Sequence, residues 1–86
     1  MFGGKDTKVC LEFDEKLCGV IIDRFGKDVM MRKSENEGKV YVYCDVVVSP
    51  HFFGWLFSLE DMVKIATPKE VAEEFKVYTE KVLGMY

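Results

Sequence analysis

The segment from Phe52 to Ser58 constrains the fold of this chain more than any other. It holds four of the twelve aromatic residues, including the only Trp, and it follows Ser49 and Pro50 almost directly. Ser is a favoured N-cap, and Pro is well suited to the first helical position. The apolar residues recur four apart and give a wide apolar stripe on a helix. We therefore expect a short buried helix, in which Gly54 leaves room for a neighbouring backbone.

Four segments have the alternation or the composition of β-strands. They are Lys8–Phe13, Val29–Lys33, Val40–Val48 and Met62–Ala66. The second and third flank a polar stretch with Gly38, which supplies the positive φ that a hairpin bend needs. These two segments predict a β-hairpin. Its second arm is rich in β-branched and aromatic residues, which favours a strand in the middle of a sheet.

A first helix is predicted between Glu15 and Phe25, where apolar residues recur at helical spacing. Asp14 is the expected N-cap, and Gly26 the expected left-handed C-cap. A glycine inside a helix costs up to about 1 kcal/mol relative to Ala. We interpret Gly19 as a place where another backbone comes close.

The last helix is predicted from a capping box. In Thr67-Pro68-Lys69-Glu70, the Thr oxygen would accept the Glu70 amide while the Glu70 carboxylate reaches back. The apolar residues that follow step by three or four positions: Val71, Phe75, Tyr78, Val82 and Tyr86. This stripe is about five turns long, and we expect it to dock the helix on the sheet.

The expected order is strand, helix, strand, strand, helix, strand, helix. It predicts an α+β fold, a ferredoxin-like βαββαβ sandwich with an additional C-terminal helix. Right-handed crossovers place the first two helices on one face of the sheet. A chain of 86 residues is too short for two cores, so residues 8–86 are expected to form one domain. Residues 1–7 show no periodicity and are expected to be a disordered lead or a linker remnant.

Strand alternation separates the two faces of the sheet. The face toward the helices is expected to carry Val9, Leu11, Phe13, Val29, Met31, Val40, Val42, Cys44, Val63 and Ile65. The opposite face, called the open face below, carries Cys10, Glu12, Met30, Arg32, Tyr41, Tyr43, Met62 and Lys64. Three explanations for this aromatic and basic face stay open: cover by the C-terminal helix, cover by another subunit, or stacking of a ligand.

Four side chains of the open face are candidates for contact with a partner or ligand: Arg32, Tyr41, Tyr43 and Lys64. The two tyrosines resemble the base-stacking aromatics of RNA-recognition sheets. The glycine and basic pattern around such aromatics is missing, and Glu12 and Asp45 are expected on the same face.

Catalytic and metal-binding patterns are missing from the sequence. His51 is the only His and is interpreted as structural, and no G-x-S-x-G or phosphate-binding glycine loop occurs. The three cysteines include no C-x-x-C and have no His at zinc-finger spacing. Trp55 is interpreted as a core residue. We therefore expect no enzyme, no cofactor and no metal.

The charge balance and the apolar runs limit the partners. Twelve Lys and Arg against fifteen Asp and Glu leave a net charge of −3, which argues against a strong nonspecific grip on nucleic acid. Apolar runs such as Val46–Val48 are too short to span a membrane, and no signal-peptide pattern opens the chain. A cytoplasmic protein is expected.

Several short patterns, taken together, point to a known family. The most specific is Ser49-x-x-Phe52-x-x-Trp55-Leu56-x-Ser58, placed before a strand and a Pro-started helix. The others are Phe13-Asp14 at a strand end, Glu37-Gly38 in a hairpin, Val63-Lys64-Ile65, and Pro68-x-Glu70. From Lys8 to Tyr86 the chain resembles the C-terminal extension of bacterial WYL-domain transcriptional regulators.

The resemblance implies a function for this chain as one part of a longer regulator. In such proteins a winged helix-turn-helix binds DNA, a WYL domain senses a ligand or nucleic acid, and the ferredoxin-like extension helps dimer contacts and regulation. Neither a helix-turn-helix nor a Trp-Tyr-Leu triplet occurs here. The implied role is thus a regulatory or dimerisation module, whose partners are a second copy or the WYL domain. The alternative is a module that binds a small effector or single-stranded nucleic acid on the open face.

Overall fold

The computed structural model describes residues 6–86, which form an α+β structure with a four-stranded antiparallel sheet and three α-helices. In chain order the elements are β1 (Asp6–Asp14), a 3-10 turn η1 (Glu15–Leu17), α1 (Cys18–Phe25), β2 (Met30–Lys33), β3 (Lys39–Val47), α2 (Pro50–Ser58), β4 (Val63–Thr67) and α3 (Lys69–Leu83). Every predicted strand and helix is present, with bounds that differ by a few residues.

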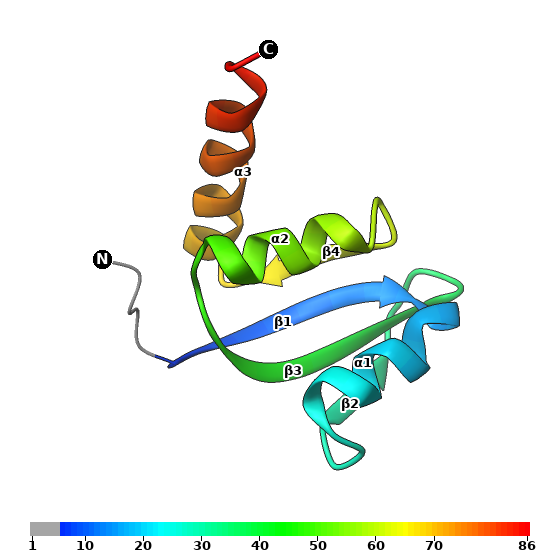
Figure 1. Cartoon of the computed structure of the whole chain (residues 1–86). Coiled ribbons are helices and arrows are strands. Elements are labelled where there is room, and N and C mark those ends of the chain that lie inside the picture. Colours follow the sequence, from blue (N-terminus) through cyan, green and yellow to red (C-terminus); the bar gives the residue numbers. More distant parts are fainter. Residues whose placement is uncertain (1–5) are drawn as a thin grey trace.

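The sheet has the strand order β2-β3-β1-β4, and all three pairings are antiparallel (Figure 1). Leu11 in β1 lies opposite Val42 of β3 and Ile65 of β4. The predicted hairpin joins β2 and β3, and Gly38 in its bend has a φ of 80°. The central place of β3 confirms the prediction from its composition. This order is compatible with a ferredoxin-like arrangement.

The core lies between the sheet and the helices α1 and α2. All ten side chains predicted for the helix-covered face belong to the core cluster or pack against it. From the helices the cluster includes Leu17, Ile21, Phe52, Phe53 and Leu56. Because these side chains share one cluster with the apolar face of β1, both helices cover the same face of the sheet, as expected.

The aromatic segment forms α2 as predicted. Ser49 is its N-cap, and the Oγ atom accepts a hydrogen bond from the Phe52 amide at 3.3 Å. Phe52 is buried, and Trp55 packs edge-on against Phe25 of α1 with ring centroids 5.6 Å apart. The Arg24 guanidinium lies 5.2 Å from the centre of the Trp55 ring. Trp55 is therefore a packing residue that joins α1 to α2.

The two helical glycines do not mark close approaches. A Cβ atom added at Gly19 in α1 or at Gly54 in α2 would meet no atom within 4 Å. Both residues are exposed, on the side of their helix that faces solvent. The prediction that another backbone comes near either of them is wrong.

The first helical segment starts and stops at the predicted residues, but its beginning is a tighter turn. The Asp14 carboxylate accepts a hydrogen bond from the Lys16 amide at 2.9 Å, and η1 precedes α1. Gly26 has a φ of 96°, and its amide donates to the Ile22 carbonyl at 2.7 Å. The positive φ was expected, although ψ is 154°, so the cap is not left-handed helical.

The predicted capping box before α3 is wrong. Thr67 is the last residue of β4 and pairs with Cys10 of β1, and the Thr67–Pro68 peptide is cis. The helix therefore starts one residue later than the box requires, with Pro68 as its N-cap. Proline has no side-chain acceptor, and the Pro68 carbonyl instead accepts the amides of Val71 and Ala72 at 3.1 and 3.2 Å.

Only the first half of α3 docks on the domain. Val71 is buried, and Phe75 and Tyr78 each lie 5.2 Å from the Phe53 ring of α2. Beyond Tyr78 the helix extends away from the sheet (Figure 1), and its last side chains are exposed. The expectation that the whole stripe docks on the sheet is therefore wrong for the last two turns.

The N-terminal boundary differs from the expectation in one respect. Asp6 and Thr7 were expected in the disordered lead, but they belong to β1, where they lie opposite Val47 and Val46. The rest of that lead, residues 1–5, lies outside the described residues. From Asp6 onward, the described chain forms a single sheet with one core.

Removing helical glycines should stabilise this fold. We expect Gly54→Ala to raise the free energy of unfolding by up to about 1 kcal/mol, because Ala is the better helix former and its methyl group meets nothing. In a domain of this size that corresponds to a rise of about 4–8 °C in Tm. Thermal unfolding followed by circular dichroism measures it.

The matched control is Gly26→Ala, which also adds one methyl group in open space. Because Gly26 has a φ of 96°, this variant should be destabilised by about 1–3 kcal/mol. A Gly54→Ala variant less stable than the wild type would contradict the packing described for α2.

Candidate functional site

The four candidate residues lie together on the open face. Strand pairing places Arg32 of β2 opposite Tyr41 of β3, and Tyr41 opposite Glu12 of β1, which in turn lies opposite Lys64 of β4. Tyr43 follows two positions along β3. The helix α3 packs on α2, on the other side of the sheet. Cover of the open face by the C-terminal helix, the first of the three explanations, is therefore wrong.

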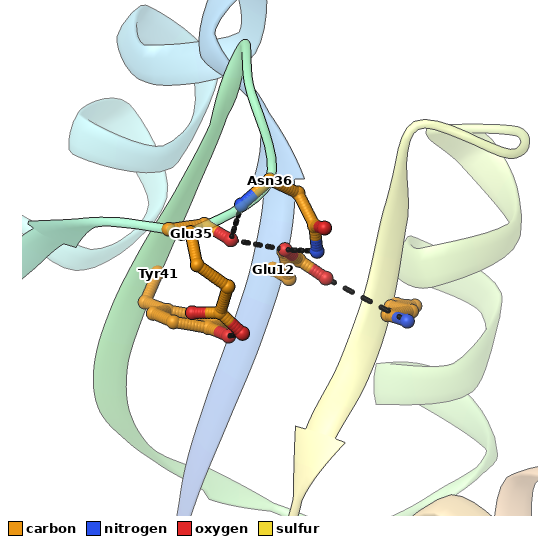
Figure 2. A network of polar contacts seen from close by, with 6 residues as sticks. Glu12, Glu35, Asn36 and Tyr41 are labelled. Atoms are coloured by element: carbon orange, nitrogen blue, oxygen red, sulfur yellow. Dashed lines mark hydrogen bonds and ion pairs between the residues drawn. The ribbon is translucent and has the colours of Figure 1, made fainter.

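A buried carboxylate lies at the centre of the open face. Glu12 is only 6% exposed, although it belongs to the face without helices. Its Oε2 atom accepts hydrogen bonds from the Ser34 hydroxyl and, at 2.8 Å, from the side-chain Nδ2 of Asn36. Its Oε1 atom lies 3.6 Å from Lys64 Nζ. Figure 2 shows these contacts, which tie the hairpin loop between β2 and β3 to β1.

The surroundings of Glu12 favour its ionised form. Hydrogen bonds from Ser34 and then from Asn36 are the largest causes that lower the pKa of Glu12, and the positive charge of Lys64 adds a smaller effect. Burial acts in the opposite direction but does not outweigh them. Glu12 is therefore held in its ionised form and anchors the hairpin loop.

The arginine and the two tyrosines bind one another. The Arg32 Nε and Nη2 atoms donate to the Tyr43 hydroxyl at 3.2 and 3.0 Å, and the guanidinium carbon lies 5.2 Å from the centre of the Tyr41 ring. The Tyr41 hydroxyl donates to Glu35 at 2.9 Å (Figure 2). This hydrogen bond to Glu35 is the largest cause that raises the pKa of Tyr41, since it stabilises the neutral phenol.

These contacts bear on how the open face would bind a ligand. A base that stacks on Tyr41 would have to displace Arg32, because the guanidinium already lies over the ring. Among the four, Lys64 would be the most available cation, since its side chain is 72% exposed and its ion pair with Glu12 spans 3.6 Å. The role of these four residues toward a ligand stays a prediction.

The described part of the chain has several surface hollows, of which three are described here. One of about 280 Å³ lies on the open face beside Tyr43, Met30 and Lys8, and one of about 220 Å³ lies beside Glu12, Lys39 and Asp61. The third, of about 300 Å³, is lined by residues including Arg24, His51 and Asp45. Each of these hollows is lined by both positive and negative side chains.

Two of the three cysteines, Cys10 and Cys44, are buried. Burial raises the pKa of Cys44 to about 12 and also raises the pKa of Cys10, so both thiols stay protonated. His51 is exposed in the first turn of α2. Within residues 6–86, no group of three or more His, Cys, Asp or Glu side chains is arranged to hold a metal ion.

Sequence analysis placed Glu12 on the open face but missed its burial and its partners. Ser34 and Asn36 were assigned only to a polar hairpin bend. One signal in the sequence could have indicated this burial: Glu12 lies in the middle of a strand between apolar residues. A carboxylate in such a place needs hydrogen-bond donors nearby. Which loop supplies those donors depends on the pairing of β1 with β3.

Comparison of the chain with protein-family models, with curated proteins and with solved structures finds no match. In the part of the chain that the structure describes, no helix is long and apolar enough to cross a membrane.

The Glu12 anchor makes stability depend on pH in a defined direction. The pKa of Glu12 is lowered in the folded state from its ordinary value of 4.5. The contribution of ionised Glu12 to the free energy of unfolding is therefore complete above pH 4.5. The contribution is lost as the pH falls through the lower folded pKa. At pH 7 we expect Glu12→Gln to lower the free energy of unfolding by about 1–3 kcal/mol. Urea unfolding at pH 7 and at about pH 3 should show that this difference shrinks in acid.

Lys64→Ala serves as the control for the ion pair. Since Lys64 is exposed, its removal should cost less than about 1 kcal/mol. An equal loss for Glu12→Gln at both pH values would show that charge is not what Ser34 and Asn36 recognise.

Proposed function

We propose that this chain is the C-terminal regulatory and dimerisation module of a bacterial WYL-type transcriptional regulator, with a ferredoxin-like fold. The strand order β2-β3-β1-β4 and the antiparallel pairings support the fold assignment. The family assignment is supported by the motif residues quoted above. In this proposal DNA binding and effector sensing belong to other domains of a longer, cytoplasmic protein, and the module itself has no catalytic role.

The main support for the proposal is that the most specific motif, from Ser49 to Ser58, forms the helix α2 and its N-cap. Phe52 and Leu56 are buried in α2, and Trp55 joins α2 to α1. Ser49 caps the start of the helix, and the Ser58 hydroxyl donates to the Trp55 carbonyl near its end. Every defined position of the motif therefore has a structural task in one helix.

The other motif residues also lie at defined places. Gly38 provides the positive φ of the β2-β3 hairpin, and Val63-Lys64-Ile65 opens the edge strand β4. Pro68 stands between β4 and α3. The residues on which the resemblance rests are thus spread over the described domain and are not confined to one segment.

The first test is the gene context and the contact that it implies. We expect about 200 residues with a winged helix-turn-helix and a WYL domain to precede this chain in its gene. That WYL domain, expressed separately, should bind the 86-residue chain in isothermal titration calorimetry. A gene with no such upstream region, or a WYL domain that does not bind, counts against the proposal.

The alternative function, binding of single-stranded nucleic acid or a small effector on the open face, has a direct test. Under our proposal, fluorescence anisotropy of labelled short oligonucleotides should stay flat, because Arg32 covers Tyr41 and Glu12 and Asp45 add negative charge. Saturable binding that Tyr43→Ala weakens by about tenfold or more would favour the alternative, since stacking contributes about 1–3 kcal/mol per base. Trp55→Phe, on the far side of the sheet, is the matched control.

A further inference from the structure

The strand β3 is longer than its neighbour β2, and its last part has an edge with no strand beside it. β2 pairs with Val40–Tyr43 of β3, whereas β1 pairs with the whole of β3 on the other side. Within residues 6–86, no strand lies beside Cys44–Val47 on the β2 side. The sheet therefore has a vacant strand position in line with β2.

The main-chain groups that face this vacant position follow from the hairpin. The Ser34 amide donates to the Lys39 carbonyl at 3.1 Å, so the main chain of Lys39 faces the β2 side. In an antiparallel ladder, every second residue directs both its N–H and its C=O group to the same side. Asp45 and Val47 therefore direct these groups to the vacant position. Both residues are exposed, and their main-chain groups are arranged to pair with an added strand.

Two of the hollows lie on either side of the vacant position. The hollow of about 280 Å³ lies on the open face and is lined by residues including Met30, Tyr43 and Asp45. The hollow of about 300 Å³ is lined by Val46 and by residues of α1 and α2, so it lies on the side of the helices. Successive side chains of a strand point to opposite faces, so those of an added strand would meet the two hollows in turn.

The hollow on the helix side contains a guanidinium group without a carboxylate partner. Arg24, near the end of α1, lines this hollow, and its guanidinium carbon lies 5.2 Å from the centre of the Trp55 ring and 6.0 Å from that of Phe25. Among the described residues, Arg24 forms no ion pair. Asp6 and Asp45 also line the hollow, but strand alternation places their side chains on the open face, away from the core residues of β1 and β3. The helix side of the vacant position is therefore cationic.

We infer that an extended peptide with an acidic side chain binds as a fifth strand beside the end of β3, antiparallel to it as β2 is. The main chain of the peptide pairs with Asp45 and Val47. Its acidic side chain lies opposite Val46 and reaches Arg24 in the hollow on the helix side. A guanidinium binds a carboxylate through two parallel hydrogen bonds, and the cation–π contact with Trp55 holds this guanidinium in place before the peptide binds.

This inference goes beyond the proposed function and does not depend on it. It concerns an edge of the sheet, and its test needs neither a second copy of the chain nor a WYL domain. The peptide side chains opposite Asp45 and Val47 lie on the open face, where the hollow beside Tyr43 and Met30 offers apolar contact. An acidic residue between two β-branched residues is therefore the pattern that fits this edge.

The probe is the peptide Thr-Val-Glu-Val-Thr with acetyl and amide ends, titrated into the 86-residue chain up to about 5 mM and followed by the amide signals in NMR spectra. We expect saturable shifts of the amide signals of Asp45 and Val47. The same peptide with Lys in place of Glu should bind about tenfold more weakly or not at all, because it brings a like charge to Arg24.

Methylation of the peptide nitrogens separates strand pairing from attraction between side chains. A methyl group on the nitrogen of either valine removes a donor that faces β3, so binding should be lost. The matched control carries the methyl group on the nitrogen of the glutamate, which faces away from β3, and it should bind like the unmodified peptide. Equal binding of the valine-methylated and unmodified peptides overturns the inference.

Arg24→Gln should weaken binding of the glutamate peptide by about tenfold, because hydrogen bonds to a charged group are among the strong ones. Arg24 is exposed, so the variant should keep the circular dichroism spectrum of the wild type. Lys33→Gln is the matched control, since Lys33 is exposed on β2 and lines none of the three hollows. No shift of the Asp45 and Val47 signals, or equal binding of the lysine and glutamate peptides, also overturns the inference.

Discussion

The burial of β1 on both of its faces is the constraint on which the rest of this domain depends. Five consecutive residues, Val9–Phe13, are buried, in a strand that pairs with β3 on one side and with β4 on the other. On the face toward the helices, Val9, Leu11 and Phe13 pack in the core beneath α1 and α2. In a domain of this size few side chains can be fully buried, so a central strand with no exposed face organises most of the available core.

Burial on the second face requires the polar network around Glu12. A carboxylate taken out of water is tolerated only with hydrogen bonds or a counter-charge. Ser34, Asn36 and Lys64 supply these from the hairpin loop and from β4. The result is an open face whose central groups are already satisfied by one another. By contrast, the last side chains of α3, among them Leu83, are exposed.

Sequence reasoning succeeded where the signal is local. The alternation of β1, the positive φ at Gly38 and the N-cap at Ser49 are each set by a few neighbouring residues, and all three are found in the structure. It failed at Gly19 and Gly54, because a glycine in a helix has the same sequence signature whether or not another backbone lies beside it.

The capping box failed for a related reason. Thr67 has the residue type and spacing of an N-cap, but its pairing with Cys10 makes it the last residue of an edge strand. The candidate residues of the open face were brought together as their alternation predicted. That Arg32 lies over Tyr41 and binds the Tyr43 hydroxyl depends on the register between β2 and β3, which the sequence does not specify.

By itself, the sequence determined which segments are strands and helices and which face of each is apolar, because periodicity, caps and turn residues act over short stretches of chain. Only the tertiary structure decided which of those faces are covered. The stripe of α3 is apolar along its whole length, yet α3 crosses α2 instead of lying along it (Figure 1), so α2 covers only the first turns. Conversely, Glu12 is polar by sequence and buried by the strands and loop around it. Whether a face is covered by another element depends on where the elements lie relative to one another, and only the packing of the whole chain sets these positions.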